Sequence, residues 1–492
     1  MLFITGGFMK KTFKILTALI LALTLCLGAW GCTPTTSAPS GKFVVSVEST
    51  TDGTNNAIIV TYSDGSTQTL TVKNGEDGAN GQKGEDGEDL TVIDVYNEYK
   101  SVYGDITFDE FLKKYLSFNQ NDNRFAIQNC LLSCMKIYTE FLVSTSLGSS
   151  QITQTKTSAG SAVIYSMDSE YTYIVTNYHV VYNEKANEEK NGGKIARKIH
   201  TYLYGSEGTP KSKSQPDADG YTTYEYGEMA IKCEYIGGAV TADIALLRAK
   251  TEDVLAINSQ ARPVQIATGY CVGETAIAIG NAENDGLSVT EGIVSVDNEK
   301  IALSIDGTAR YYRSIRIDTA LYHGNSGGGL FNVDGELIGI TNAGNEDDQN
   351  INFAIPYSIV TGVVENILYY YGDGDDQTNG AYKPTIGFTS LIESSSFVYN
   401  EQTQTGEIHE NVIVVEVLEN TFAQSMGLLA DDYIKAITLN GEETEITRDY
   451  ILSDLILTLR PGDTIALTVK RGEETITLSP VTFQKSDFNV IE

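Results

Sequence analysis

The sequence predicts a mostly β protein with two folded regions, an antiparallel barrel or sandwich over about residues 127–367 and a separate smaller domain over 383–485. Two observations carry this prediction. Many short runs rich in Val, Ile, Thr and Tyr are separated by Gly, Asn and Asp turns. The chain also has 46 glycines but only nine prolines, which is typical of β-structure with tight turns. Because one ordinary core does not accommodate 492 residues, two or three domains are expected.

The first 32 residues have the pattern of a secretory signal peptide. Basic residues at 10, 11 and 14 precede an apolar run over 15–30, which is marginal for a permanent membrane span. Cys32 follows Gly31 and resembles the lipidated cysteine of bacterial lipoprotein signal peptides, although Ala29 stands where leucine is usual. We therefore expect an exported protein, lipid-anchored through Cys32 at the extracytoplasmic face of a bacterial cell membrane. An ordinary cleaved signal peptide is the alternative.

Residues 33–90 are predicted to connect this signal to the folded regions. The polar stretch 33–41 is typical of a flexible tether, and the alternating pattern of 43–72 around a turn at 63–66 predicts a small hairpin. Glycine then recurs at every third position, which is a collagen-like spacing, at residues 75, 78, 81, 84 and 87. These triplets contain no proline and are mostly acidic, so we interpret them as a solvated spacer, with a triple helix as the alternative.

Apolar residues recur at helical spacing after the triplets, which predicts a small helical module over 91–124. The folded chain is then expected to continue as a main domain over 125–370, a linker over 371–382 and the smaller domain.

Charge and cysteine content exclude several classes of function. A formal net charge of −31 argues against nucleic-acid binding, which requires basic surface. Cys130 and Cys134 are expected to be buried free thiols, because no histidine or second close cysteine pair completes a metal site. Pairing of Cys233 with Cys271 stays open. We expect neither a metal nor another cofactor.

Three residue types in a particular order suggest nucleophilic catalysis. Ser326 lies in the glycine-rich run 324–328, where a tight backbone can direct amide groups inward. Such a run alone also occurs in plain loops and in α/β-hydrolases. In those hydrolases the acid and the histidine follow the serine, whereas here His179 and Asp243 precede it and only His409 follows. The order His, Asp, Ser is that of chymotrypsin-type enzymes.

Six ordered segments between residues 159 and 357 share a family pattern. They are Ala159-Gly160-Ser161-Ala162-Val163-Ile164, Thr176-Asn177-Tyr178-His179-Val180, Asp243-Ile244-Ala245, the pair Ala278-Ile279-Gly280-Asn281 and Val289-Thr290-Glu291-Gly292-Ile293-Val294-Ser295, Asp318-Thr319-Ala320 through Gly324-Asn325-Ser326-Gly327-Gly328, and Asn352-Phe353-Ala354-Ile355-Pro356. Together they resemble the trypsin-like protease domain of the HtrA family. The resemblance implies a double β-barrel of the chymotrypsin type over 125–370.

The resemblance also implies the roles of the site residues. His179 would act as general base and then acid, Asp243 would orient its imidazole, and Ser326 would attack the peptide carbonyl. Backbone N–H groups of Gly324 and Ser326 would form the oxyanion hole, with Asn325 nearby.

Two residues depart from the family pattern. Ala282 stands where proline is usual, and His323 stands beside the oxyanion loop where Pro, Arg or Gln is commoner. Neither departure removes a catalytic group.

Ala320 and Leu321 occupy the stretch that forms the bottom of the primary specificity pocket in this fold. Without an acid there, a small or medium apolar P1 residue is expected.

The smaller domain contains runs such as 412–417, 423–428 and 432–437 that resemble the PDZ domain following HtrA protease domains. By this pattern, backbone N–H groups of Ile386, Gly387 and Phe388 would receive the carboxylate of a peptide C-terminus, and the peptide would add a strand.

The resemblance implies an exported serine endopeptidase that cleaves unfolded or damaged proteins and whose relatives are commonly trimeric. Two alternatives remain: a catalytically silent protease scaffold that presents the PDZ domain to partner tails, and a surface stalk protein built on the glycine triplets.

Overall fold

The computed structural model describes residues 44–52, 55–62, 67–73, 100, 123–147, 150–345, 348–371, 380–400 and 405–491. Two compact units divide the chain at residues 117 and 118, and each is described by itself. The predicted signal peptide with Cys32, the tether, the glycine-triplet spacer, the helical module and the linker lie wholly or largely outside the described residues. Among the described residues, no helix is both long and apolar enough to cross a membrane.

The first unit contains an antiparallel meander in the order β1-β2-β3, formed by β1 (Val44–Asp52), β2 (Asn55–Tyr62) and β3 (Thr67–Lys73). The sequence analysis expected two strand-like runs here. The structure has two strands, β1 and β2, in the first of these runs.

The second unit begins with a closed six-stranded barrel in the order β10-β11-β6-β5-β4-β7. We call it barrel 1. Its strands are β4 (Cys134–Leu147), β5 (Ser150–Met167), β6 (Tyr171–Thr176), β7 (Lys198–Leu203), β10 (Ile231–Ala239) and β11 (Ile244–Lys250). A short ribbon of β8 (Lys211–Ser212) and β9 (Tyr224–Glu225) lies in the connection between β7 and β10.

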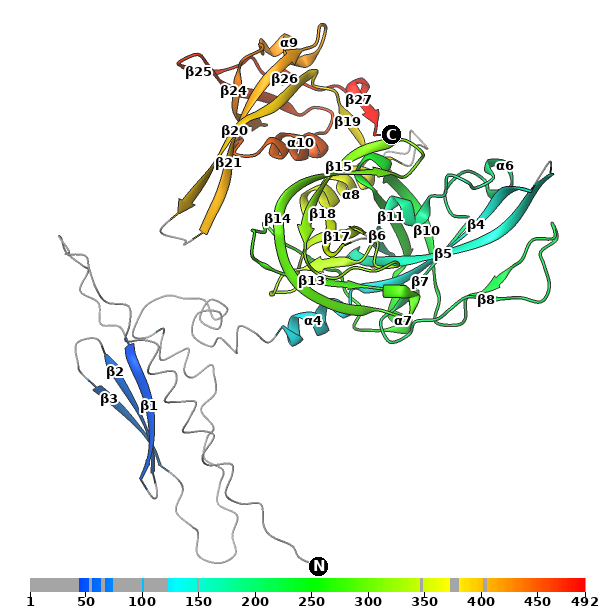
Figure 1. Ribbon diagram of the computed structural model, residues 1–492, viewed down its shortest axis with the longest axis horizontal. Helices are drawn as coiled ribbons and strands as arrows, with labels where there is room; N and C mark the ends of the chain where they lie inside the picture. The colour runs from blue at the N-terminus through cyan, green and yellow to red at the C-terminus, as the bar shows by residue number, and fades with distance from the viewer. Residues whose placement is uncertain are drawn as a thin grey trace, which may run out of the picture. The chain divides into compact units, whose positions relative to one another are not determined.

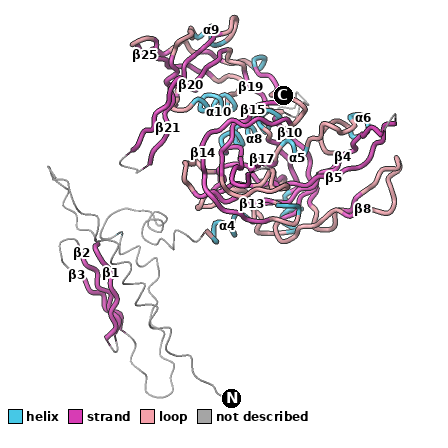
Figure 2. The backbone as a smooth tube through the Cα atoms, viewed as in Figure 1, coloured by secondary structure: helices cyan, strands magenta, loops and turns pink. Residues whose placement is uncertain are grey.

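A second barrel, barrel 2, follows in the chain. Six of its strands close a ring, because β17 pairs with both β16 and β18, and β12 adds to β17 in parallel. Its strands are β12 (Gln265–Ile266), β13 (Thr275–Gly280), β14 (Ser288–Ser304), β15 (Ala309–Ile317), β16 (Gly329–Phe331), β17 (Glu336–Asn345) and β18 (Asp348–Pro356). Figure 1 labels β13, β14, β15, β17 and β18 of this barrel, and Figure 2 distinguishes strands from helices by colour. The predicted mostly β double barrel is confirmed.

Short helices connect and flank the barrels. They are α4 (Arg124–Leu131), α5 (Tyr178–Val181), α6 (Glu188–Asn191), η1 (Val240–Ala242), α7 (Thr251–Ile257), η2 (Ala282–Asn284) and α8 (Tyr357–Tyr371).

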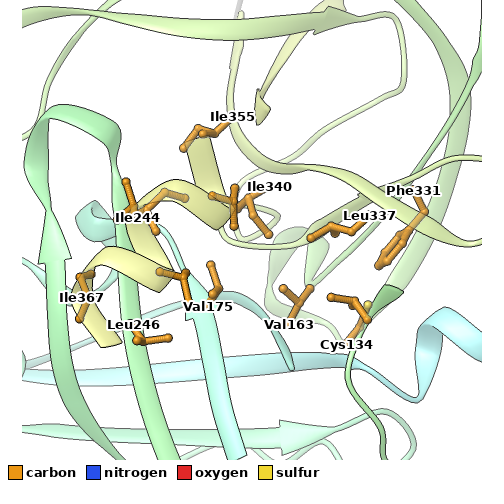
Figure 3. Close-up of a cluster of buried hydrophobic side chains, with 14 of the residues drawn as sticks. Cys134, Val163, Val175, Ile244, Leu246, Phe331, Leu337, Ile340, Ile355 and Ile367 are labelled. Carbon is orange, nitrogen blue, oxygen red and sulfur yellow. The ribbon is translucent and has the colours of Figure 1, made fainter. Parts of the chain in front are cut away.

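The largest hydrophobic cluster joins the two barrels. Val163, Val175 and Leu246 contribute from barrel 1, whereas Phe331 and Ile340 contribute from barrel 2 (Figure 3). Helix α8 adds apolar side chains to the same cluster. Each barrel also has an interior cluster of its own. Because burial of apolar surface favours association of the barrels, this shared cluster holds fixed the loops that meet at their junction.

The C-terminal region has a separate core built on the sheet order β20-β21-β22-β24-β25. Its elements are β19 (Tyr382–Pro384), β20 (Phe388–Asn400), β21 (Thr405–Val417), α9 (Phe422–Met426), β22 (Tyr433–Leu439), β23 (Glu442–Glu445), α10 (Asp449–Thr458), β24 (Thr464–Arg471), β25 (Glu474–Thr477), β26 (Val481–Thr482), η3 (Lys485–Asp487) and β27 (Phe488–Val490). Two of these elements are α-helices, α9 and α10. The region also extends past residue 485, because β27 pairs with β19.

Helix α10 packs against α8 of the preceding region. The Leu457 side chain fills the space next to Gly362 of α8. Asn366 Nδ2 of α8 also donates to the carbonyls of Leu457 (2.9 Å) and Tyr382 (2.7 Å). Two ion pairs, Arg313–Asp454 and Arg448–Asp297, also join barrel 2 to the C-terminal region.

Candidate active site

His179 and Asp243 face each other at the edge of barrel 1. His179 lies in α5 directly after β6, and Asp243 lies between η1 and β11. Asp243 has a left-handed φ of 52°, which aspartate tolerates better than most residues. Its Oδ2 lies 2.8 Å from His179 Nδ1, and its Oδ1 accepts the His179 backbone N–H at 2.9 Å. Both carboxylate oxygens therefore hold His179.

The environment of His179 changes its basicity. Burial lowers the pKa of the imidazole, but the negative charge of Asp243 and its hydrogen bond more than offset this effect, so the pKa lies above its usual value of 6.5. Asp243 is fully buried, whereas the His179 side chain keeps 34% of its surface exposed. With Nδ1–H committed to Asp243, the lone pair of Nε2 is available to accept a proton.

The serine loop, residues 324–328, is held by strands of both barrels. Ser161 of β5 donates its backbone N–H to the Ser326 carbonyl at 2.8 Å and its hydroxyl to the Gly324 carbonyl at 2.7 Å. Gly327 has a φ of 88°, and a side chain there would come within 2.1 Å of the Ser161 carbonyl. The loop can therefore approach β5 only because residue 327 is glycine.

Two amide groups of this loop have no acceptor. The His323 carbonyl accepts the Glu283 N–H at 2.7 Å, and the Asn325 carbonyl accepts Thr341 Oγ1 at 2.6 Å. In a trans peptide the N–H points opposite to the carbonyl. The N–H groups of residues 324 and 326 thus point away from these partners, and neither donates a hydrogen bond within the part of the chain that the structure describes.

Asn325 differs from its neighbours in the loop. Its backbone N–H donates to the Tyr322 carbonyl at 3.0 Å. Its side chain is buried, and the Oδ1 atom has no hydrogen-bond partner. Among the described residues, the backbone N–H of Asn325 is therefore already engaged, unlike those of Gly324 and Ser326.

The Ser326 hydroxyl is not hydrogen-bonded to His179 in this structure. It donates to the Asn342 carbonyl of β17 at 3.0 Å. The segments that carry Ser326 and His179 both lie close to Gly160. A side chain at residue 160 would be 2.9 Å from Val180, which follows His179, and 3.2 Å from the Ser326 carbonyl. Catalytic hydrogen bonds are often unformed in structures without substrate, so the absence of this bond does not argue against a catalytic pair.

The predicted specificity residues lie in the segment between β15 and the serine loop. The Ala320 carbonyl accepts Thr290 Oγ1 at 2.8 Å, and Leu321 packs against the interior cluster of barrel 2. Neither side chain is acidic.

The predicted carboxylate loop lies at the start of β20. Gly387 has a φ of 94°, and its carbonyl accepts the Leu418 N–H at 2.9 Å. The Ile386 carbonyl accepts the Ala423 N–H at 2.8 Å. Among the described strands, β20 pairs with β21 alone and is an edge of its sheet.

The cysteine predictions have a clear outcome. Cys130, Cys134 and Cys233 are buried and Cys271 is exposed, and all four are free thiols. Burial raises the pKa of Cys130 to about 12, which keeps that thiol protonated and unreactive at neutral pH.

Sequence reasoning did not assign roles to the residues that hold the site together. Ser161 was visible only as part of a family-like strand motif, although it contacts the serine loop at two carbonyls. Thr341 and Glu283 gave no sequence signal, because the first acts through a hydroxyl on a strand and the second through its backbone N–H.

Comparisons with known proteins agree with this geometry. Residues 160–340 match the family described as trypsin-like peptidase domain. That segment contains all three residues of the candidate triad. The matched segment takes in strands of both barrels.

Curated relatives have serine protease names. The chain is 28% identical over 332 residues to the serine protease Do-like HtrA of Bacillus subtilis strain 168, which covers 66% of this chain and 63% of that protein. It is 29% identical over 328 residues to the serine protease Do-like HtrB of the same organism, which covers 65% and 61% respectively. The chain thus spans about three fifths of the length of these two relatives.

A solved structure is also similar. The HtrA-type protease AlgW with a decapeptide is 22% identical, covers 73% of this chain and 97% of its own, and has a TM-score of 0.44.

Proposed function

We propose that this protein is a serine endopeptidase of the HtrA kind that uses His179, Asp243 and Ser326. The observation that carries the proposal is the His179–Asp243 pair beside a serine loop with two unused N–H groups. Base, orienting acid, nucleophile and oxyanion donors are the groups that hydrolysis by serine requires.

The reaction would begin with rotation of Ser326 away from the Asn342 carbonyl. His179 Nε2 then takes the hydroxyl proton while Oγ attacks the peptide carbonyl, and the N–H groups of residues 324 and 326 stabilise the oxyanion. The imidazolium, stabilised by Asp243, gives its proton to the leaving amine. Water then repeats the sequence and releases the acyl group.

The test is hydrolysis of unfolded casein by the wild-type protein and by Ser326→Ala. We expect turnover to be lost in the variant, because removal of the nucleophile leaves only residual catalysis. Equal turnover by the variant would contradict the assignment. If neither protein hydrolyses casein, the silent scaffold is the better description.

We further propose that the C-terminal region is a PDZ domain that binds peptide C-termini. The free edge of β20 and the left-handed Gly387 support a peptide adding as a strand, with its carboxylate at the N–H groups of Ile386, Gly387 and Phe388. A labelled peptide with a free carboxyl end should bind, and its C-terminal amide should bind at least about tenfold more weakly.

The substrate and location complete the proposal. Unfolded or damaged proteins with small or medium apolar P1 residues are the expected substrates, since Ala320 and Leu321 carry no charge. Export, lipidation at Cys32 and a homotrimeric assembly are proposed from sequence alone. Radiolabelled palmitate incorporation that is lost in Cys32→Ala would test the anchor.

A further inference from the structure

A strained turn lies against the serine loop. In residues 281–286, Glu283 has a φ of 52° and Asn284 a φ of 65°, and neither is glycine. Such left-handed conformations persist only when surrounding groups hold them, and they gather at functional sites. The Gly286 N–H donates to Asn281 Oδ1 at 3.1 Å, which closes the turn.

This turn controls one of the two unused amides. The Glu283 N–H donates to the His323 carbonyl at 2.7 Å, and that carbonyl belongs to the same peptide as the Gly324 N–H. The Asn281 carbonyl lies 2.2 Å from the position of a side chain on Gly324, so the turn and the loop are in direct backbone contact. Without the hydrogen bond from the Glu283 N–H, the His323–Gly324 peptide plane could rotate. The Gly324 N–H would then point in a different direction.

A buried lysine of barrel 1 holds the turn. Lys136 Nζ donates to the Asn284 carbonyl at 2.8 Å, although only 2% of Lys136 is exposed. No carboxylate of the described residues pairs with this ammonium, and its other close contact is the Tyr138 ring, with Nζ 5.0 Å from the centroid. Lys136 is opposite Ser161 in the β4–β5 register, so two paired residues hold the turn and the loop together.

Stability alone does not account for a cation at this position. Burying an ammonium without a carboxylate is costly, and an apolar side chain of similar length would pack there without that cost. The charge is therefore better explained by the carbonyl that it orients.

We propose that Lys136 is a positioning residue for the oxyanion hole, which it acts on through the 281–286 turn and the His323–Gly324 peptide. The proposal rests on the proposed peptidase function. Lys136 touches neither substrate nor reacting atoms. Its effect should therefore fall on stabilisation of the transition state, with little change in substrate binding.

The test compares Lys136→Met, which keeps length and removes the charge, with Lys136→Arg and with Lys156→Met as matched control. Lys156 is exposed on β5, and its side chain makes no hydrogen bond or ion pair among the described residues. We expect kcat of Lys136→Met to fall about 10- to 100-fold with KM within about twofold, a smaller loss than removal of an oxyanion donor itself. The inhibition constant of a peptide boronic acid, whose tetrahedral adduct uses the same amides, should rise by a similar factor.

Two further results support the proposal: recovery of most of kcat in Lys136→Arg, and a melting temperature of Lys136→Met no lower than that of wild type. An unchanged kcat in Lys136→Met would overturn it. So would a parallel loss of kcat, substrate binding and thermal stability, which would mark a merely structural role.

A readout without activity separates this proposal from the peptidase assignment. Hydrogen exchange measured by mass spectrometry should show faster exchange for the peptide containing Glu283 in Lys136→Met than in Lys156→Met, because the turn is no longer held. This measurement can be made on Ser326→Ala. If wild type lacks Ser326-dependent turnover, the peptidase assignment fails, and unchanged exchange rejects the role of Lys136 independently.

Discussion

Single residues set the chemistry of the candidate site through their immediate contacts. Asp243 uses one oxygen for the His179 ring and the other for the His179 backbone, so one carboxylate fixes both the tautomer and the position of the base. Its charge raises the pKa of His179 above the usual value. This pairing stabilises the folded protein at acid pH, and the contribution is lost as pH rises through the pKa of His179.

Replacing Asp243 by asparagine should change both rate and pH dependence. In wild type, kcat/KM should rise with pH through a value above 6.5, because only neutral imidazole accepts the serine proton. In Asp243→Asn this limb should move to lower pH, since burial then lowers the pKa of His179 without an opposing charge. The maximal kcat should fall about 10⁴-fold.

The measurement is a pH profile of kcat/KM for the variant and for Asp253→Asn, an exposed position on α7. An acid limb that stays in place in Asp243→Asn would contradict the assigned origin of the pKa shift.

Replacement of Gly327 should be more damaging than replacement of Gly205, because the two glycines differ in the space around them. Gly327 and Gly205 both have positive φ, at 88° and 80°, but only Gly327 has neighbours where a side chain would sit. Gly205→Ala should cost about 1–2 kcal/mol of unfolding free energy from backbone strain alone. Gly327→Ala should cost more and abolish turnover, because the loop must move away from Ser161. Denaturant melts and casein assays of the two variants test this, and equal losses would refute the steric argument.

At this scale the sequence suggested a triad, of which the structure brings His179 and Asp243 into contact, and it identified few of the residues that support the serine loop. The order His179, Asp243, Ser326 excluded other hydrolase types because their order differs. The contacts of Lys136 and Ser161 were out of reach, because they join strands of one barrel to loops of the other. Such contacts depend on how the barrels dock, which no local pattern encodes.

At the scale of elements, helix α8 contacts strands of both barrels and helix α10 of the C-terminal region. One face of α8 adds to the cluster between the barrels, and another packs on α10. Buried Asn366 ties α8 to the C-terminal region through its side-chain amide. Its Nδ2 donates to the Leu457 and Tyr382 carbonyls, and its Oδ1 accepts the Tyr382 N–H. The sequence analysis expected short strands and turns up to about residue 367, so it missed α8, which begins at Tyr357.

Asn366→Leu should destabilise the protein although the new side chain is apolar and similar in size. The substitution leaves buried backbone groups without partners, at about 1–3 kcal/mol for each unsatisfied group. Glu365→Leu, at an exposed position of the same helix, is the control and should change the unfolding free energy by less than about 0.5 kcal/mol. Urea titrations of both variants provide the measurement. A loss no greater in Asn366→Leu than in the control would show that these hydrogen bonds contribute nothing net.

Over the whole second unit, ion pairs connect barrel 2 to the C-terminal region. Arg448 pairs with Asp297 of β14 and with Glu410 of β21, and its guanidinium lies 5.2 Å from the centroid of the Tyr450 ring. Arg313 of β15 stacks on the same ring at 3.7 Å and pairs with Asp454. Because these groups are largely buried, salt screens them less than surface pairs.

A double-mutant cycle should reveal coupling across this junction. We expect Arg448→Met and Asp297→Asn to give a coupling free energy of about 1–3 kcal/mol in thermal or urea unfolding. The exposed pair Lys250–Glu252 serves as reference and should give less than about 1 kcal/mol. Additive effects at Arg448 and Asp297 would mean that the pair does not hold the two regions together.

The hydrophobic cluster between the barrels should determine the order in which turnover and secondary structure are lost in denaturant. His179 and Asp243 belong to barrel 1 and Ser326 belongs to the loop before β16 of barrel 2, so they meet only while Val175 and Leu246 stay packed near Ile340. Mild denaturant that parts the barrels should therefore stop turnover before either barrel loses its strands. If the proposed function is right, turnover should then be lost while each barrel is still folded, and it should return once the barrels dock again.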